Sequence, residues 1–450
     1  MNTRFLIWVT FVAVMGGLLF GLNMAGISGA VDGIKSDFAL TDSGLGTVAA
    51  LLTIGCLIGA LFTGNFTEKY GRKKVMIVTA VLYIISALGC AFAASSLILI
   101  AFRLLSGLAV GATSVVAPMY ISEISPAKKR GRLVSFNQFA ITIGIVVAYV
   151  FDYLLVNAGE NSWRFMLAVP AVFGVFYLIF LLLDFPESPR WLLAHGRNEE
   201  AKKVLIRLGG QVLLDEELPE MESALAAEQK KEKMSVSELF RGKTGKIVLI
   251  GTLIAAFQQV TGINAVIMFA PDIFQSAGAA KVDSLMLAMI VGTVNFLATI
   301  LALWLVDKSG RKTLLLWGAV GMAASLAYLT IEFAKAEQNG TGVLIALLVY
   351  IAFFAASFAP VMWVIISEIY PNRIKGVAMS FSTAVSWLCT FLTVYFAPVI
   401  HGTFGLQYLF GIFGFFSVAA WIFVKIWIPE TKGKTLEVIH AELLGAESGE

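Results

Sequence analysis

The sequence predicts an all-α membrane protein whose twelve transmembrane helices form two similar halves. Of its 450 residues, 58% are hydrophobic and 14% are charged, whereas roughly 25% of the residues in soluble domains are charged. Twelve stretches are apolar over the roughly 20 residues that a helix needs to cross a bilayer. Three short motifs also recur in the same order in the two halves of the chain. These observations exclude a soluble protein with one large hydrophobic core.

The first predicted span could be confused with a secretory signal. Only Arg4 provides a charge ahead of it, and its apolar run is longer than the hydrophobic region of a signal peptide. Because it also opens the first half of the duplicated pattern, we expect it to be retained as a helix. The twelve spans are predicted at residues 5–27, 45–67, 75–94, 97–119, 134–156, 163–185, 247–270, 285–306, 313–333, 342–366, 376–399 and 407–428.

The three repeated motifs lie at nearly one offset. They are EKYGRK at 68–73 and DKSGRK at 307–312, ISEI at 121–124 and at 366–369, and PES at 186–188 and PET at 429–431. The offsets are 239, 245 and 243 positions, which indicates that one unit has been duplicated. Internally duplicated membrane proteins are typically transporters, with the substrate site between the copies.

The duplication and the composition divide the chain into four predicted parts. These are a six-helix bundle over 1–185, a cytoplasmic helical linker over 186–246, a second six-helix bundle over 247–428 and a cytoplasmic tail over 429–450. The linker holds 11 Lys or Arg and many Glu. Within it, Ser188-Pro189 predicts the start of one helix and Asn198 the start of a second, which stops at Gly209-Gly210. A third amphipathic stretch is expected from about 215 to 232.

The distribution of basic residues predicts the orientation of the chain. With the N-terminus inside, 28 of the 33 Lys and Arg fall in cytoplasmic segments or helix ends, four fall outside and Arg103 lies within a span. This asymmetry predicts a multi-pass protein of the cell (inner) membrane with both termini in the cytoplasm. The basic residues stand in short loops beside spans, so we expect a lipid bilayer around the protein and no nucleic acid as a partner.

Cysteine and histidine usage gives no sign of a metal site, a cofactor or a disulfide. Cys56, Cys90 and Cys389 all lie in apolar spans, and the 3 His are far apart in sequence. The glycine-containing turns at Gly71 and Gly310 have the wrong spacing for nucleotide binding. Because the sequence also has no recognisable pairing of a nucleophile with a base, we expect the protein not to be an enzyme.

Charged residues near the cytoplasmic ends of the spans form matched sets in the two halves. Charges at this depth are partly dehydrated and prefer to pair. We predict two ionic clusters that close the cytoplasmic side in one state and separate in the other; the alternative is that these residues only fix the topology. The predicted gate residues are Arg72, Glu123, Arg130, Glu187, Arg311, Glu368, Lys375 and Glu430.

Several motifs resemble those of the sugar porter family of the major facilitator superfamily, over essentially the whole chain. They are GRK at 71–73 and 310–312, PMYISE at 118–123, PESPRWL at 186–192, QQ at 258–259 with GIN at 262–264, and PETKGKTLE at 429–437. The GRK motifs are shared across the superfamily, whereas PESPRW and the paired Gln are more specific. The resemblance implies the major facilitator fold, alternating access and a monosaccharide substrate.

A sugar site needs neutral groups that both donate and accept hydrogen bonds, and aromatic rings that cover the C–H faces of the sugar. Amides within spans could instead join helices, at about 1 kcal/mol per contact. The resemblance favours binding, because the family places sugar ligands at positions that match several of these residues. The predicted substrate-binding residues are Phe20, Gln138, Gln258, Gln259, Asn264, Asn295, Trp363 and Trp387.

Four positions depart from the usual pattern of the family. Met268 and Phe269 stand where members usually carry two tyrosines. Ala359 stands where Gly is frequent, and Ser386 stands where many members carry an amide. These differences predict a less polar site and leave a deoxy or smaller sugar open as the substrate.

The first span carries FGLN at 20–23, which resembles a family motif whose fourth residue is Asp in proton-coupled members. Asn23 occupies that position here, and Arg103 matches the arginine that faces the Asp in the family. An amide cannot gain and lose a proton during a transport cycle. We therefore predict a facilitative uniporter, which we expect to function as a monomer. The alternative is a proton-coupled sugar or polyol symporter that uses another coupling group.

Two other classes of protein fit the sequence less well. A drug exporter of the same superfamily would carry a carboxylate at the membrane centre rather than paired Gln. A sugar sensor would carry a long cytoplasmic extension, whereas the predicted tail covers only 429–450.

Overall fold

The computed structural model describes residues 3–126, 130–229, 242–370 and 375–432. Over this part of the chain every regular element is a helix. The helices before the central linker are α1 (Thr3–Ala25), η1 (Ser28–Ala30), α2 (Val31–Asp37), α3 (Asp42–Tyr70), α4 (Arg72–Ala91), α5 (Ser96–Ile124), α6 (Arg130–Leu155) and α7 (Ser162–Leu182).

The remaining helices lie in the linker and in the second half of the chain. They are α8 (Pro189–Ala194), α9 (Asn198–Gln229), α10 (Gly242–Val260), α11 (Ile263–Met268), α12 (Ala270–Ser276), α13 (Lys281–Ser309), α14 (Arg311–Phe333), α15 (Gly340–Ala356), α16 (Phe358–Ile369), α17 (Lys375–Phe404) and α18 (Leu406–Trp427). Within the described residues, twelve helical stretches are long and apolar enough to cross a membrane, which confirms the predicted number of spans.

Two of the predicted spans are interrupted helices. The seventh, expected at 247–270, is divided into α10 and α11 at Gly262, whose φ of 96° is left-handed, and α12 follows directly. The tenth, expected at 342–366, is divided into α15 and α16 at Ser357, which has φ −131° and ψ −84°. Pro360 follows this break and lacks the N–H that would bond back across it. Sequence reasoning placed both spans but missed both breaks.

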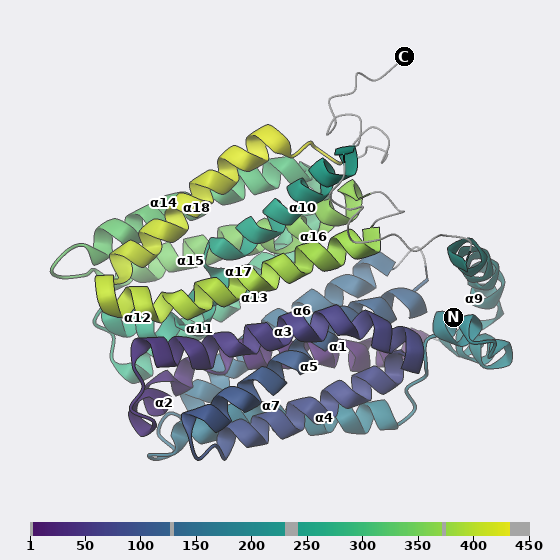
Figure 1. The fold of residues 1–450 in the computed structure, drawn as a ribbon, viewed down its shortest axis with the longest axis horizontal. Helices are drawn as coiled ribbons and strands as arrows, with labels where there is room; N and C mark the ends of the chain where they lie inside the picture. The colour runs from purple at the N-terminus through teal and green to yellow at the C-terminus, as the bar shows by residue number, and fades with distance from the viewer. Residues whose placement is uncertain (1–2, 127–129, 230–241, 371–374, 433–450) are drawn as a thin grey trace. The chain divides into compact units, whose positions relative to one another are not determined.

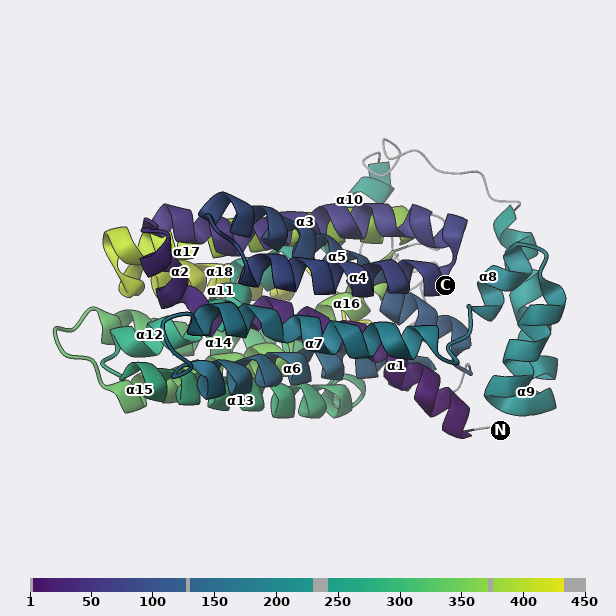
Figure 2. The same cartoon turned by 90° about the horizontal axis from the view of Figure 1, so that it is seen from below.

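The chain forms two compact units. Unit 1 comprises Met1–Asn23, Gly55–Ile145 and Leu167–Lys233, and unit 2 comprises Met24–Ile54, Val146–Met166 and Met234–Glu450. In unit 1, α4 packs on α5 and α8 packs on α9 (Figure 2). In unit 2, α14 packs between α15 and α18, and α10 packs on α17 (Figure 1). The four-part division of the chain inferred from the sequence stays a prediction.

Small residues let helix backbones meet inside unit 1. A Cβ atom at Gly55 would lie 2.2 Å from the carbonyl oxygen of Leu104, and one at Gly111 would lie 2.1 Å from that of Cys56. Helices α3 and α5 therefore touch through their main chains, which only glycine permits at this spacing. This contact fixes the position of α5 along the axis of α3. Helix α5 carries Arg103 and Glu123.

The linker follows the predicted helix starts. The hydroxyl of Ser188 accepts a hydrogen bond from the backbone N–H of Trp191 at 3.3 Å and caps α8, as expected from Ser188-Pro189. The next helix begins at Asn198, as predicted. Gly210 has φ 74° and ψ −168°, which are not helical, so the helix from Asn198 ends there as predicted. A further helical stretch continues to Gln229 and covers the described part of the stretch expected from about 215 to 232.

Candidate functional site

The unit 1 charge cluster consists of Arg72, Glu123, Glu187 and Ser188. The Arg72 guanidinium donates two hydrogen bonds to the Glu123 carboxylate, Nε to Oε2 at 3.0 Å and Nη2 to Oε1 at 2.7 Å. The hydroxyl of Ser188 donates to the same carboxylate. The Arg72 and Glu123 side chains are only 10% and 7% exposed, so the ion pair between them is largely dehydrated.

Glu187 caps the start of α4 from a distant part of the chain. Its carboxylate accepts the backbone N–H groups of Arg72 at 2.9 Å and Lys73 at 3.2 Å. A carboxylate in this place satisfies helix N–H groups and faces the positive end of the helix dipole. Burial raises the pKa of Glu187, while the N–H groups of Ser188, Lys73 and Arg72 and the Arg72 charge act to lower it.

The unit 2 charge cluster repeats this arrangement with Arg311, Glu368, Glu430 and Thr431. Arg311 Nη2 donates to Glu368 Oε1 at 3.1 Å, and the Thr431 hydroxyl donates to the same carboxylate. The Glu430 carboxylate accepts the backbone N–H groups of Arg311 at 2.9 Å and Lys312 at 3.1 Å. Each copy of the duplicated unit therefore pairs one Arg with one Glu and caps one helix with a second Glu.

The two clusters contain most of the predicted gate residues. The side chains of Arg130 and Lys375 lie outside the described residues. Sequence reasoning grouped Glu187 and Glu430 with the ion pairs and missed their capping role, although both stand in the repeated PES and PET motifs. In each cluster the ion pair joins residues of a single unit, and the gating role stays a prediction.

The amide cluster consists of Gln258, Gln259 and Asn264 in unit 2. Asn264 Nδ2 donates to Gln259 Oε1 at 2.7 Å, and Gln259 Nε2 donates to Gln258 Oε1 at 2.9 Å. Gln258 Nε2 in turn donates to the main-chain carbonyls of Phe358 at 3.0 Å and Ala359 at 3.2 Å. Three carboxamides thus form one directed chain that ends on the backbone at the start of α16.

The break at Gly262 brings these amides together. On a continuous α-helix, residues five positions apart point about 140° away from each other. Gln259 is the penultimate residue of α10 and Asn264 is the second residue of α11, and the left-handed Gly262 between them reverses that divergence. Gln258 is buried at 4% exposure, whereas Gln259 and Asn264 are half-buried.

The other predicted site residues fall in both units. Asn295 on α13 and Trp387 on α17 are buried in unit 2, and Trp363 on α16 is 39% exposed there. Phe20 and Gln138 belong to unit 1 and are half-buried. Met268 and Phe269, at the positions where tyrosine was expected, are both buried. The binding role of all these residues stays a prediction.

Asn23 and Arg103 lie beside each other in unit 1, as the resemblance implied. Arg103 Nη1 donates to the main-chain carbonyl of Asn23 at 3.2 Å. The Asn23 side chain donates to the Leu19 carbonyl at 2.8 Å and accepts a hydrogen bond from the Ser106 hydroxyl at 2.5 Å. The amide nitrogen and the oxygen of the buried Asn23 side chain therefore bond to two different partners.

Three carboxylates near the ends of the spans are engaged in local contacts. Asp152 on α6 is 1% exposed and accepts hydrogen bonds from Ser28 and from the backbone N–H of Gly29. Glu332 on α14 is also 1% exposed and binds Lys335 at 2.6 Å. Asp32 lies 3.3 Å from Lys281. Each carboxylate sits close to an end of its helix.

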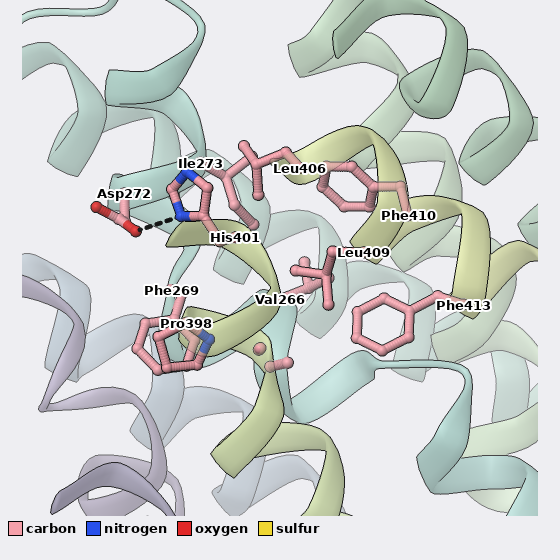
Figure 3. A pocket seen from close by; sticks show the side chains of 12 residues that line it. Val266, Phe269, Asp272, Ile273, Pro398, His401, Leu406, Leu409, Phe410 and Phe413 are labelled. Atoms are coloured by element: carbon pink, nitrogen blue, oxygen red, sulfur yellow. Dashed lines mark ion pairs between the residues drawn. The ribbon is translucent and has the colours of Figure 1, made fainter. Parts of the chain in front are cut away.

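A pocket in unit 2 lies between α11, α12, α17 and α18 (Figure 3). Its lining is mostly apolar, including Phe410 and Phe413, with one pair of polar groups in which His401 Nδ1 lies 3.4 Å from Asp272 Oδ2. None of the predicted sugar-binding residues lines it. An apolar lining offers few partners for sugar hydroxyls, so this pocket does not replace the amide cluster as the candidate site.

The chain is similar over nearly its whole length to known transporters. A family model described as "Sugar (and other) transporter" matches residues 9–443. The D-xylose-proton symporter of Escherichia coli (strain K12) is 35% identical over 480 residues, covering 98% of this chain and 96% of that protein. The glucose transporter GlcP of Staphylococcus epidermidis is 36% identical over 442 residues, covering 98% and 97%.

Solved structures of a related sugar transporter have the same fold as this chain. The inward-open structure of the xylose transporter XylE from E. coli superposes with a TM-score of 0.86 at 33% identity, covering 97% of this chain and 99% of that one. XylE is described as a member of the major facilitator superfamily. The all-α fold class predicted from the sequence is therefore confirmed, and the chain belongs to the sugar porter family of the major facilitator superfamily.

Proposed function

We propose that this protein moves a monosaccharide across the inner membrane by alternating access, as a facilitative uniporter. The amide cluster carries the substrate part of this proposal, because Gln259 and Asn264 are neutral, half-buried and able to donate and accept. The relatives named for D-xylose and for glucose support a monosaccharide.

The proposed binding residues are those that can meet hydroxyls or cover the ring. In unit 2 these are Gln259, Asn264, Asn295, Trp363 and Trp387, and in unit 1 they are Phe20 and Gln138. Gln258 is proposed to belong to the same site. Its carboxamide already makes three hydrogen bonds within the protein.

Counterflow in proteoliposomes tests the substrate assignment. Vesicles loaded with one unlabelled sugar from a panel of hexoses, pentoses and deoxy sugars are diluted into the labelled sugar. We expect uptake with at least one monosaccharide and a loss of at least tenfold in apparent affinity with Gln259→Ala and with Trp363→Ala. Unchanged kinetics in both variants would refute the proposed site.

The uniport part of the proposal depends on Asn23, which has no titratable proton. The second candidate, proton symport, is favoured by the names of several relatives, among them the D-xylose-proton symporter of E. coli and the arabinose-proton symporter of Bacillus subtilis. A protonophore separates the two: it leaves the final sugar level of a uniporter unchanged and lowers that of a symporter.

We further propose that both termini lie in the cytoplasm and that one chain is sufficient for transport. The excess of Lys and Arg in the segments on one side supports the orientation. A fluorescent protein fused after Glu450 should fold and fluoresce in cells, whereas a periplasmic phosphatase fused there should stay inactive; the opposite pair of results would reverse the orientation.

A further inference from the structure

We propose that His401 and Asp272 form a pH-sensitive restraint on α12, which tightens when the external side becomes acidic and then slows sugar exchange. The restraint presupposes the proposed transport function and orientation, in which the end of α17 that carries His401 is the external one. It concerns the rate of transport rather than its driving force. His401 exchanges its proton with one side of the membrane only, so the restraint regulates a uniporter without causing accumulation.

The imidazole of His401 lies between two polar groups of α12. Its Nδ1 lies 3.4 Å from Asp272 Oδ2 (Figure 3), and its Nε2 lies 3.4 Å from the hydroxyl oxygen of Ser276. The two partners are four positions apart, so they lie on one face of the helix. Only a protonated imidazole has an N–H group at both nitrogens. The protonated form of His401 can therefore donate to both partners, and its charge attracts the Asp272 carboxylate.

The other surroundings of His401 leave Asp272 as its charged partner. The residues of α11 and α18 that line the pocket beside it are all apolar. At the start of α3, Asp42 lies against the main chain next to His401, because a Cβ atom at Gly402 would collide with the Asp42 carboxylate. Asp42 is itself paired with Lys35 at 2.7 Å. The His401 and Asp272 side chains are 30% and 33% exposed, so protons from outside can reach the pair.

Helix α12 is built to move separately from the longer helices around it. It is only seven residues long and follows Phe269, whose φ of −114° and ψ of 19° are not helical. Gly278, with a left-handed φ of 91°, comes two residues after its end. Segments between such points are the usual hinges of a conformational change. The pair between His401 and Asp272 ties this short helix to the end of α17.

The position in which α12 is tied belongs to a closed external side. Helix α12 packs on η1, which comes from the first repeat. Beside it, Lys281 at the start of α13 pairs with Asp32 of α2 at 3.3 Å, so these two charges are matched to each other. Entry of sugar from outside requires the two repeats to separate here. A stronger bond between α12 and α17 therefore opposes opening.

The direction of the pH effect follows from the charge on the imidazole. Histidine is the side chain whose charge ordinarily changes between about pH 5 and 8, whereas exposed carboxylates stay ionised over that range. Acidification therefore adds a positive charge to His401 opposite the Asp272 carboxylate. The restraint is strong at the acidic end of this range and weak at the alkaline end.

The rate of sugar exchange as a function of pH tests this restraint. Proteoliposomes hold the sugar at equal concentration and equal pH on both sides, between about pH 5.5 and 7.5, so that no gradient exists. The variants are His401→Gln, which cannot become charged, His401→Lys, which is charged throughout, and Asp272→Asn. The matched control is His195→Gln, which removes the linker histidine that stacks on Trp191.

We expect exchange by the parent protein to slow about two- to fivefold between about pH 7.5 and 5.5, which is the effect of a partly exposed ion pair. His401→Gln and Asp272→Asn should keep the fast rate at every pH, and His401→Lys should keep the slow rate. His195→Gln should behave as the parent does. A purely structural role of His401 would not give opposite, pH-independent rates for Gln and Lys.

Labelling of α12 provides a second measurement that needs no sugar. In a background without Cys56, Cys90 and Cys389, the substitution Ile273→Cys places a thiol on α12 at a residue that is 2% exposed. With an impermeant maleimide outside, adding His401→Gln should accelerate labelling about two- to fivefold at about pH 5.5 and leave it unchanged at about pH 7.5. The comparison at each pH removes the pH dependence of the thiol itself.

The restraint is refuted if exchange by the parent protein does not change with pH, or if the change survives in His401→Gln or in Asp272→Asn. If His401→Gln does not yield monodisperse protein, Asp272→Asn provides both measurements in its place. Failure of the proposed transport function looks different, because no variant would then exchange any monosaccharide. The labelling comparison would in that case still show whether the pair restrains α12.

Discussion

At the scale of single residues, Asn23 distinguishes between two modes of transport. Its carboxamide donates to the Leu19 carbonyl and accepts from Ser106, and Arg103 contacts its main chain. An Asp at this place could exchange a proton, whereas an Asn cannot. The buried Arg103 next to it supplies the positive charge that would favour the ionised form of such a carboxyl group.

The substitution Asn23→Asp should therefore introduce proton dependence. We expect sugar accumulation above equilibrium when a pH gradient, acid outside, is imposed on proteoliposomes that contain the variant. Asn23→Ser, which also lacks a titratable proton, is the matched control and should show none. A variant that transports sugar but ignores the gradient would show that a carboxyl group here is not sufficient.

The two Arg–Glu pairs differ in geometry, which predicts different responses to lysine. Arg72 binds Glu123 through two nitrogen atoms, a fork that an ammonium group cannot reproduce. Arg311 binds Glu368 through one hydrogen bond at 3.1 Å. Arg72→Lys should cost about 1.5–3 kcal/mol of stability, and Arg311→Lys should cost less. Thermal unfolding in detergent measures both, and a larger loss for Arg311→Lys would contradict this reading.

Sequence reasoning reached the chemistry of these residues but not all of their contacts. Paired amides in an apolar span, and acids matched to bases in two copies, were visible without a structure. The bonds from Gln258 to Phe358 and Ala359 were not, because the partner is a main-chain group 100 positions away at an unrecognised helix break. Every residue has a main-chain carbonyl, so the residue types in the sequence do not show which carbonyl accepts a hydrogen bond.

At the scale of elements, both copies use a carboxylate to start a helix after a left-handed glycine. Gly71 has φ 93° and precedes α4, and Gly310 has φ 86° and precedes α14. A Cβ atom at Gly71 would lie 2.2 Å from Glu187 Oε2, and one at Gly310 would lie 2.5 Å from Glu430 Oε2. The Gly in GRK is thus needed for its φ and for the space that the capping carboxylate occupies.

Alanine at either glycine should therefore destabilise the protein. We expect Gly71→Ala and Gly310→Ala to lose about 1–3 kcal/mol each from the backbone conformation alone, with a further loss where the carboxylate is displaced. Gly64→Ala is the control, because Gly64 lies in helix α3 with nothing within 4 Å of an added Cβ. Detergent unfolding curves in which all three variants behave alike would count against the explanation.

Element boundaries show where the sequence pattern is weakest. The fourth span was predicted to end at 119, but α5 continues to Ile124 and carries Glu123 on its last turn. Apolar periodicity ends before the helix does, since charged residues extend it beyond the lipid. The breaks at Gly262 and Ser357 lie inside apolar runs, so hydropathy does not reveal them; they are seen in the left-handed φ of Gly262 and the non-helical backbone of Ser357.

At the scale of the whole molecule, the two repeats also meet inside unit 2. Tyr149, from the first repeat, is fully buried and its hydroxyl donates to the Ile267 carbonyl of the second at 2.7 Å. Ser43 and Tyr395 form a second such contact at 3.1 Å. In the proposed orientation these contacts lie toward the external side of the membrane.

Removing the hydrogen bond between Tyr149 and the Ile267 carbonyl should favour conformations in which α6 and α11 move apart. Tyr149→Phe loses one hydrogen bond worth about 1 kcal/mol, which shifts a two-state equilibrium about fivefold. We expect external labelling of Ile267→Cys, at a residue that is 6% exposed in this structure, to accelerate by about that factor. Tyr408→Phe, at a residue that is 58% exposed, is the control. Equal labelling rates in both backgrounds would show that the contact does not restrain this side.

The sugar accumulation ratio under an imposed proton gradient distinguishes passive transport from proton symport in this protein. Proteoliposomes with this protein are given a gradient, acid outside, in the presence of the labelled sugar that counterflow identifies. Passive transport by a carrier with Asn23 predicts that the internal and external sugar concentrations become equal and stay equal. An internal concentration above the external one that collapses with a protonophore would contradict the account and identify a proton symporter.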